Sequence, residues 1–346
     1  MSDLALKATP SATPGRPRLW RRLAARVQPQ YLLLLLFGGL LALLHAFAPQ
    51  RLSFNIMSVR YALWMMLSFA AAALVVELFH ATRGRPRTVR EALARSAAML
   101  RDWFPFVLCL WVYENLHDLT HWLRPDTVDE ALARADGWLF GAQPTLWLEQ
   151  WAHPLLTDWM ALAYLTYFVF PPLLAGWLYF AGHTGAFREL QLGLLVAFYG
   201  GFIGYILVPA VGPQLILAGQ YRGPLTGRYV YWGAKVLVTT LQTFPRDCFP
   251  SLHTAISTVT LLFLLRHRRS VPLRPVVLPA VTLLTVSLWV STVYLRYHWF
   301  VDVLAGFALA LLATLSGIAF ERRWPRPAPA RCVDAPRHAG IMPPHC

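Results

Sequence analysis

Long apolar runs alternate along the chain with shorter polar segments that are rich in arginine. A helix needs roughly 17–25 predominantly apolar residues to cross a bilayer core about 30 Å thick. Runs of this length recur and predict eight membrane-spanning helices, so the expected fold class is an all-α, polytopic membrane helix bundle. The predicted spans are 31–48, 57–80, 97–115, 157–181, 188–210, 251–266, 276–294 and 298–320.

Composition supports this prediction, since hydrophobic residues make up 57% of the 346 residues and charged residues only 14%. A soluble globular domain carries about 25% charged residues. The chain therefore has too few charges to cover a soluble globule of its size, and we expect the membrane as its environment.

The formal net charge of +14 would indicate a nucleic-acid partner in a soluble protein, but its distribution indicates membrane topology instead. Arginine clusters precede the first span, join the second to the third, join the sixth to the seventh, and follow the eighth. With eight spans and a cytoplasmic N-terminus, all these clusters lie on the cytoplasmic side, as the positive-inside rule requires. We expect an integral membrane protein of a bacterial inner membrane or its equivalent, with cytoplasmic termini and no nucleic-acid partner.

The predicted organisation has four parts. Residues 1–30 lack an apolar period and are expected to form a disordered, basic cytoplasmic arm. Residues 31–96 contribute two extra N-terminal helices and a basic loop. Residues 97–320 form a six-helix membrane domain that carries the candidate chemistry, and the proline-rich residues 321–346 form a disordered cytoplasmic tail.

Two histidine motifs near the C-terminal end carry that chemistry. His253 ends the segment Phe249–His253 and opens the sixth span, while His298 opens the eighth. Positions i and i+4 share a helix face, so Asp302 can hold one ring nitrogen of His298 and leave the other free to attack or to accept a proton. Both histidines are expected on the periplasmic or luminal face, where they suit an acid–base pair of a phosphoryl-transfer site.

A second constellation belongs to another class of site. His117 and His121 stand at i and i+4 with Asp118 between them, as in a metalloprotease helix that has Asp in place of Glu. Because the shorter Asp is poorly placed as a base and no third ligand is indicated, polar contacts at a helix end are the favoured interpretation. The four cysteines make no disulfide framework and no zinc spacing, and Cys248 is interpreted as a small residue that packs a loop. We expect no metal and no cofactor.

The motif Pro250–His253 and the spacing His298-x3-Asp302 resemble the second and third signature motifs of the type 2 phosphatidic acid phosphatase superfamily. The likeness covers about residues 130–318 and is closest to the inositol-phosphorylceramide synthase-like branch. Further segments that resemble this branch are Asp136–Gly141, Tyr164–Pro172 and Ser291–Leu295.

This resemblance implies roles for three residues and a six-helix catalytic core. His298 is the implied nucleophile, which forms a phosphohistidine, and Asp302 orients it. His253 protonates the leaving group and then activates the acceptor. Such chemistry is physically coherent, because phosphoryl transfer depends mainly on in-line positioning and on cations around the phosphate oxygens.

The chain departs from the family pattern at the phosphate-binding positions. Thr292 stands where the phosphatases have an arginine, Gln214 replaces another arginine after Gly-Pro, and the first signature motif has no clear counterpart. The expected substitutes are Arg246, with Arg222 and Arg296 behind it, together with Ser251 and the first amides of its helix.

The loss of the motif arginine is shared with the inositol-phosphorylceramide synthase-like branch. It favours a phosphotransferase that passes a phosphate or phospho-alcohol headgroup from a bilayer lipid to a lipid or alcohol acceptor. The main alternative is a phosphatase that uses water as acceptor, on a lipid phosphate or a polyprenyl diphosphate. A membrane metalloprotease and a non-enzymatic transporter are distant alternatives, and the oligomeric state is left open.

Overall fold

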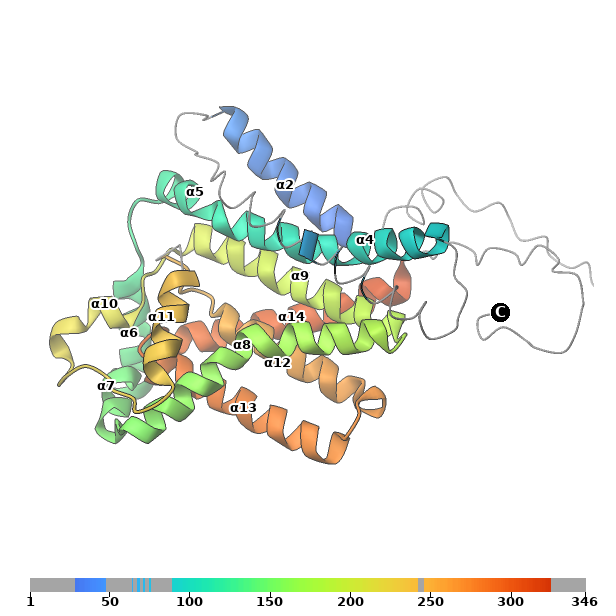
Figure 1. Cartoon of the computed structure of the whole chain (residues 1–346). Coiled ribbons are helices and arrows are strands. Elements are labelled where there is room, and N and C mark those ends of the chain that lie inside the picture. Colours follow the sequence, from blue (N-terminus) through green and yellow to red (C-terminus); the bar gives the residue numbers. More distant parts are fainter. Residues whose placement is uncertain are drawn as a thin grey trace, which may run out of the picture. The chain divides into compact units, whose positions relative to one another are not determined.

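A computed structural model describes residues 29–47, 64, 67, 68, 71, 75, 89–241 and 246–324. The described residues form helices joined by turns and loops, and no strand is formed among them (Figure 1). This confirms the predicted all-α fold class. Residues Pro29–Arg322 form one compact unit. Most of the predicted arm, the span 57–80 and the tail lie outside the described residues.

Among the described residues, four helices are long and apolar enough to cross a membrane, which fits an integral membrane protein. They are α8 (Pro154–Phe180), α9 (Thr184–Leu207), α13 (Arg274–Tyr294) and α14 (Phe300–Arg323). Each falls on a predicted span.

Three further helices correspond to predicted spans but differ in length or composition. Helix α2 (Pro29–Phe47) and helix α12 (Leu252–Arg266) are apolar but shorter, and α12 has only 15 residues. Helix α4 (Val89–Glu114) is long enough but carries charged residues such as Arg101 and Asp102. It begins before the predicted span 97–115, because its first turns are amphipathic and the apolar-run criterion does not detect them.

Short helices gather at one end of the unit (Figure 1). We call this the histidine end, since it carries His253 and His298. Here α9 and α13 end, while α12 and α14 begin. The short elements of the loops at this end are α5 (Leu116–Leu123), α6 (Asp129–Phe140), α7 (Pro144–Leu148), η1 (Glu149–Trp151), α10 (Pro213–Ile216), η2 (Ala218–Gln220) and α11 (Tyr231–Leu241).

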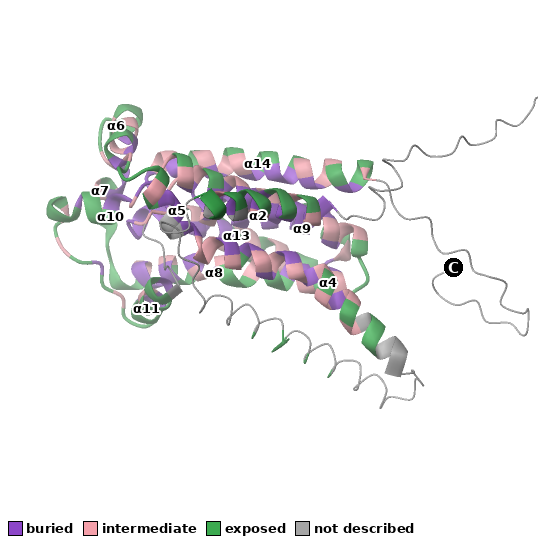
Figure 2. Ribbon diagram, turned by 90° about the horizontal axis from the view of Figure 1, so that it is seen from above, coloured by how far each residue is buried: buried purple, intermediate pink, exposed green. Residues whose placement is uncertain are grey.

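Helix α12 lies at the centre of the packing, in contact with α8, α9 and α13. Most of its residues are buried, as expected of a helix whose apolar residues are spread around its circumference. Figure 2 shows exposed residues along α2, on the outside of the unit, and many buried residues on α9. The site residue at the start of α12 is therefore held by packing on several sides.

Helix α14 approaches α12 closely through Gly306. A Cβ at this position would lie 2.7 Å from the carbonyl oxygen of Ser251 and 2.9 Å from Cβ of Thr254. Only glycine allows this distance, and the Ser251 amide donates to the Asp302 carbonyl at 3.1 Å in the same contact. The crossing brings the two histidine motifs together.

Candidate active site

The two histidines meet although 45 residues separate them. His298 Nε2 lies 3.3 Å from His253 Nδ1. His253 is the second residue of α12, and His298 precedes the first residue of α14, which is Phe300. The predicted start of the last span at 298 is therefore two residues early, and His298 stands in the loop rather than on the helix.

A backbone carbonyl determines the proton position on His298. Its Nδ1 lies 2.9 Å from the Cys248 oxygen and 3.5 Å from Asp302 Oδ2. A carbonyl oxygen only accepts hydrogen bonds, so the neutral ring carries its proton on Nδ1. The lone pair is then on Nε2, the nitrogen that faces His253.

Asp302 stabilises the loop as well as the histidine. Its Oδ2 accepts the Trp299 amide at 2.8 Å, which closes the turn between His298 and α14. The same oxygen accepts the Cys248 thiol at 2.9 Å. The carboxylate is fully buried, and these donors and His298 replace the lost water at Oδ2, whereas Oδ1 has no hydrogen-bond partner among the described residues.

Cys248 is a contact that the sequence did not indicate. The side chain packs a buried loop, as expected, but its sulfur lies against Asp302 and 3.5 Å from His298 Nδ1. Burial raises the pKa of the Cys248 thiol well above its ordinary value, and the neighbouring Asp302 carboxylate adds to the shift. The thiol is therefore a hydrogen-bond donor at neutral pH and not a nucleophile.

Asp136 anchors the beginning of α14 from the outer helix α6. Its two carboxylate oxygens accept the amides of Phe300 at 2.8 Å and Val301 at 2.9 Å. A carboxylate at a helix N-terminus satisfies orphan amides and interacts favourably with the helix dipole. Burial raises the pKa of Asp136, and the two amide hydrogen bonds oppose that shift. Asp136 thus contributes to the position of the loop that carries His298.

Asp129 accepts backbone amides from residues 209–213, a segment with two prolines and one glycine that joins α9 to α10. Its oxygens accept the Val211 and Gly212 amides, each at 2.9 Å, and the Trp299 indole N–H at 2.9 Å. Gly212 has φ +88°, and a Cβ there would lie 2.6 Å from the Tyr297 oxygen, so glycine is required. This segment holds a carboxylate of the protein itself and ties it to the histidine loop.

Aromatic side chains of α8 cover His253. The Tyr164 ring stacks on it at a centroid distance of 4.3 Å, and the Tyr164 hydroxyl lies 3.3 Å from His253 Nδ1. Tyr167 lies at 4.3 Å and Phe168 at 6.5 Å. His253 is partly exposed, whereas His298 is only 3% exposed. A substrate would therefore approach along the His253 side of the pair.

Of the predicted phosphate-binding residues, Ser251 stands two residues before His253 and caps α12. Its hydroxyl oxygen accepts the Thr254 amide at 3.3 Å and the Thr254 hydroxyl at 3.1 Å. Among the described residues, the amides of Leu252 and His253 have no hydrogen-bond partner. These amides open the helix beside His253, where helix N-termini favour phosphate.

The three predicted arginines have partners other than the two histidines. Arg296 forms a buried ion pair with Glu149 at 2.9 Å, and its guanidinium carbon lies 3.7 Å from the Tyr221 ring centre. Arg222 is exposed and donates its amide to the same carboxylate. Arg246 donates to the Arg124 carbonyl at 3.0 Å. Within the described part of the chain, none of these guanidiniums is bonded to either histidine.

One group of side chains near the pair has donors that suit a metal ion. Ligand atoms of Cys248, His298 and Asp302 all lie within 4.8 Å of one another. Sulfur, nitrogen and carboxylate ligands suit Zn²⁺, although this set contains the nucleophile candidate itself. Of the other candidate set, the side chains of His117 and Asp118 lie outside the described residues, and His121 is exposed on α5.

A comparison with protein-family models supports the interpretation of these motifs. The model that matches residues 130–316 describes the PAP2 superfamily. The chain belongs to the PAP2 superfamily. The match includes both histidine motifs and Asp136, and it confirms the superfamily that the motifs indicated. Neither a comparison with curated proteins nor one with solved structures gives a match.

The position of the missing motif arginine has a backbone role in this member of the PAP2 superfamily. The Thr292 carbonyl accepts the amides of Tyr297 and His298, each at 3.0 Å. The Thr292 hydroxyl donates to the Trp289 carbonyl of its own helix at 2.7 Å. Thr292 is fully buried and therefore orients the histidine loop without contributing a charge.

Proposed function

We propose that this PAP2-superfamily protein is a membrane lipid phosphotransferase that works through a phosphohistidine on His298. The arrangement of the His298 ring carries the proposal. Its Nδ1 proton is held by the Cys248 carbonyl at 2.9 Å, and its Nε2 lies 3.3 Å from His253. A nucleophile with a fixed tautomer next to a second titratable ring is the arrangement that covalent phosphoryl transfer requires.

The first half of the reaction forms a phosphorus–nitrogen bond. The lone pair of His298 Nε2 attacks phosphorus, and the bond from phosphorus to the leaving oxygen breaks. His253 enters this step as the imidazolium, gives one proton to that oxygen and becomes neutral. The positive charge left on the His298 ring is stabilised by Asp302, whose Oδ2 lies 3.5 Å from Nδ1.

The second half regenerates the enzyme. His253, now neutral, takes the proton of the acceptor hydroxyl while the acceptor oxygen attacks phosphorus. The phosphorus–nitrogen bond breaks and its electron pair returns to His298 Nε2. Atoms and charges balance over the cycle, and no cofactor takes part.

Phosphate binding in this proposal uses the start of α12 and one arginine. The N-terminus of α12 binds the phosphate oxygens through the amides of Leu252 and His253 and through the Ser251 hydroxyl. Arg246 is the favoured cation, because its described hydrogen bond is to a neutral carbonyl. Arg296 is less suitable, since Glu149 already compensates its charge. Arg222 stays a secondary candidate.

The burial of His298 and the aromatic surface around His253 favour an acceptor other than water. His298 is 3% exposed, and Tyr164, Tyr167 and Phe168 cover His253 with aromatic surface. Such a site suits two lipid substrates that enter from the bilayer, as in the inositol-phosphorylceramide synthase-like branch. Arginine clusters outside the histidine end support a periplasmic or luminal site under the positive-inside rule.

Product analysis tests the proposal. The purified full chain in nanodiscs is incubated with phosphatidylinositol, phosphatidate or a polyprenyl diphosphate, with ceramide and diacylglycerol as acceptors, and the lipids are measured by mass spectrometry. We expect a new phospholipid, at least about a thousandfold less with His298→Ala or His253→Ala, which corresponds to about 4 kcal/mol.

The matched control is His183→Ala, an exposed histidine at the N-terminus of α9, which is expected to keep full activity. Free phosphate without any new phospholipid would identify a phosphatase instead. Activity that survives His298→Ala would contradict the nucleophile, and loss of activity with a chelator would indicate a metal route.

A further inference from the structure

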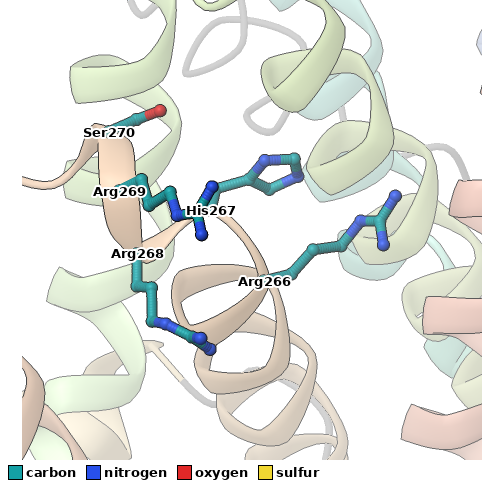
Figure 3. Close-up of a pocket in the computed structure, with 5 residues that line it drawn as sticks. All are labelled: Arg266, His267, Arg268, Arg269 and Ser270. Atoms are coloured by element: carbon teal, nitrogen blue, oxygen red, sulfur yellow. The ribbon is translucent and has the colours of Figure 1, made fainter.

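A basic pocket lies at the other end of α12, away from the histidines. It has a volume of about 360 Å³ and is lined by Arg266, His267, Arg268, Arg269 and Ser270 (Figure 3). The rise of an α-helix is 1.5 Å per residue, so the backbones of His253 and Arg266 are about 20 Å apart along α12. The pocket takes no part in the chemistry of the histidine pair.

Side chains from two neighbouring helices fix the backbone of this turn. Glu189 of α9 accepts two hydrogen bonds from the Arg266 guanidinium, at 2.8 and 3.1 Å, and lies 2.8 Å from His267 Nε2. On the α8 side, the Trp177 indole N–H donates to the Ser270 carbonyl at 2.9 Å. Glu189 is only 7% exposed, so the turn is held by a buried charge and not by surface contacts alone.

The remaining charge of the pocket is positive. Glu189 compensates one guanidinium, that of Arg266, whereas Arg268 and Arg269 stand on the turn Arg268–Ser270 that follows α12 (Figure 3). Among the described residues, no carboxylate pairs with Arg268 or Arg269. Two exposed guanidiniums on a fixed turn offer ten N–H donors between them, which suits the oxygens of a phosphate group.

The position of the pocket indicates where this phosphate comes from. The turn joins α12 to α13, and α13 is one of the helices long and apolar enough to cross a membrane. Its first residues therefore stand at the level of lipid headgroups. Basic pockets between helices at this level bind anionic headgroups, whereas arginines that only determine topology need no pocket.

We propose that the Arg266–Ser270 pocket binds the phosphate group of an anionic phospholipid in the leaflet opposite the histidine pair. Arg268 and Arg269 provide the charge, and Glu189 and Trp177 hold the turn that presents them. The site is structural or regulatory and is separate from the transfer reaction. The same phosphate chemistry could come from free inorganic phosphate, so the test has an arm for each source.

The test is a titration of the full chain, purified in detergent, with phosphatidylglycerol, with phosphatidylcholine and with inorganic phosphate, followed by native mass spectrometry. We expect phosphatidylglycerol to bind at least about tenfold more tightly than phosphatidylcholine. The double variant Arg268→Gln/Arg269→Gln should lose that preference, a change of about 1.4 kcal/mol for each factor of ten.

The matched control removes the same charge at the same end of the unit. Arg188→Gln/Arg274→Gln changes two arginines that do not line the pocket, and it should keep the preference to within about twofold. Arg268→Lys/Arg269→Lys retains charge and should bind at an intermediate level. Competition by inorganic phosphate would identify the free ion as the source.

An equal loss in both glutamine variants would overturn the proposal, because it would show attraction by net charge alone. Retention of the preference in Arg268→Gln/Arg269→Gln would overturn it as well. Thermal unfolding in phosphatidylcholine nanodiscs checks that each variant is folded. If Arg268→Gln/Arg269→Gln does not fold, Arg268→Lys/Arg269→Lys decides the question. An unchanged affinity and preference for phosphatidylglycerol in the lysine variant would exclude recognition by guanidinium groups.

Discussion

The tautomer of the neutral His298 ring depends on a backbone group, the Cys248 carbonyl, whereas the thiol of the same residue donates to Asp302. The carbonyl persists when residue 248 is substituted, so the two functions can be separated. Removal of the thiol leaves one hydrogen bond fewer on a fully buried carboxylate. A hydrogen bond to a charged group contributes about 1.5–3 kcal/mol, and a thiol is a weak donor.

We therefore expect Cys248→Ala to lower kcat about tenfold, at the low end of that range, with the substrate KM little changed. Cys248→Ser keeps a donor toward Asp302 and should lower kcat by less than about threefold. Steady-state kinetics in nanodiscs measure both variants, and unfolding temperatures check that they are folded. Wild-type kcat in Cys248→Ala would show that the thiol has no positioning role.

At this scale the sequence predicts some partners and not others. The proximity of His253, His298 and Asp302 follows from their motifs, because each motif opens a helix on the same side of the membrane. The role of Cys248 could not be predicted, since one cysteine has no spacing to interpret and its partner is 54 residues away. Arg296 shows the same limit, because formal charge does not reveal that Glu149, 147 residues earlier, compensates it.

Helices α14 and α6 are joined through Asp136, and this contact belongs to the scale of elements. Asp136→Asn replaces one accepting oxygen by an NH₂ group that faces a backbone N–H. We expect a loss of about 1–3 kcal/mol in the free energy of unfolding and a lower kcat, because α14 begins directly after the histidine loop. Thermal unfolding and kinetics measure these effects.

Asp126→Asn is the matched control for this change. Asp126 is an exposed carboxylate in the same outer region. Its substitution should change the free energy of unfolding by less than about 0.5 kcal/mol and should leave kcat unchanged. Equal behaviour of the two variants would contradict an anchoring role for Asp136.

The crossing of α12 and α14 makes a second prediction about elements. Gly306→Ala places a methyl group 2.7 Å from the Ser251 oxygen, so the helices must separate at the point that joins the two motifs. We expect about 1–3 kcal/mol of destabilisation and a reduced kcat.

Gly176→Ala in α8 is the control for Gly306→Ala, because a Cβ there meets nothing within 4 Å. It should stabilise the protein by about 0.4–1 kcal/mol through the unfolded chain. Thermal unfolding compares the two variants. A neutral Gly306→Ala would mean that α14 is not held against α12 as described.

Apolar runs predict most of the long helices, because a helix needs apolar residues whether its surface is covered by lipid or by protein. Their boundaries depend on other forces. Helix α14 begins at Phe300 and not at 298, since Asp136 accepts its first amides, and this partner is 164 residues away. Every residue except proline carries the same backbone N–H group, so the sequence does not show which amides Asp129 and Asp136 accept.

At the scale of the whole molecule, the arginine clusters predict which end faces the cytoplasm. A membrane-impermeant maleimide tests this on Asp126→Cys at the histidine end and on Arg274→Cys at the start of α13, both exposed positions. The background carries Cys332→Ser and Cys346→Ser. Cys109 and Cys248 are buried, and the raised pKa of Cys248 further slows its reaction.

In intact cells we expect labelling at residue 126 and protection at residue 274, with both labelled after permeabilisation. The opposite pattern would place the histidine end in the cytoplasm and overturn the topology. Charge distribution predicts this feature because orientation depends on loop charge and not on the details of packing.

Direct capture of the covalent intermediate tests the central claim. The full chain is mixed with ³²P-labelled phosphatidylinositol or phosphatidate, quenched in alkaline denaturant within one turnover, and digested for mass spectrometry. We expect an acid-labile phosphoryl or phospho-alcohol adduct on His298, absent in His298→Ala and unchanged in His183→Ala. Label on any other residue, or single-turnover product without label on His298, would contradict the account.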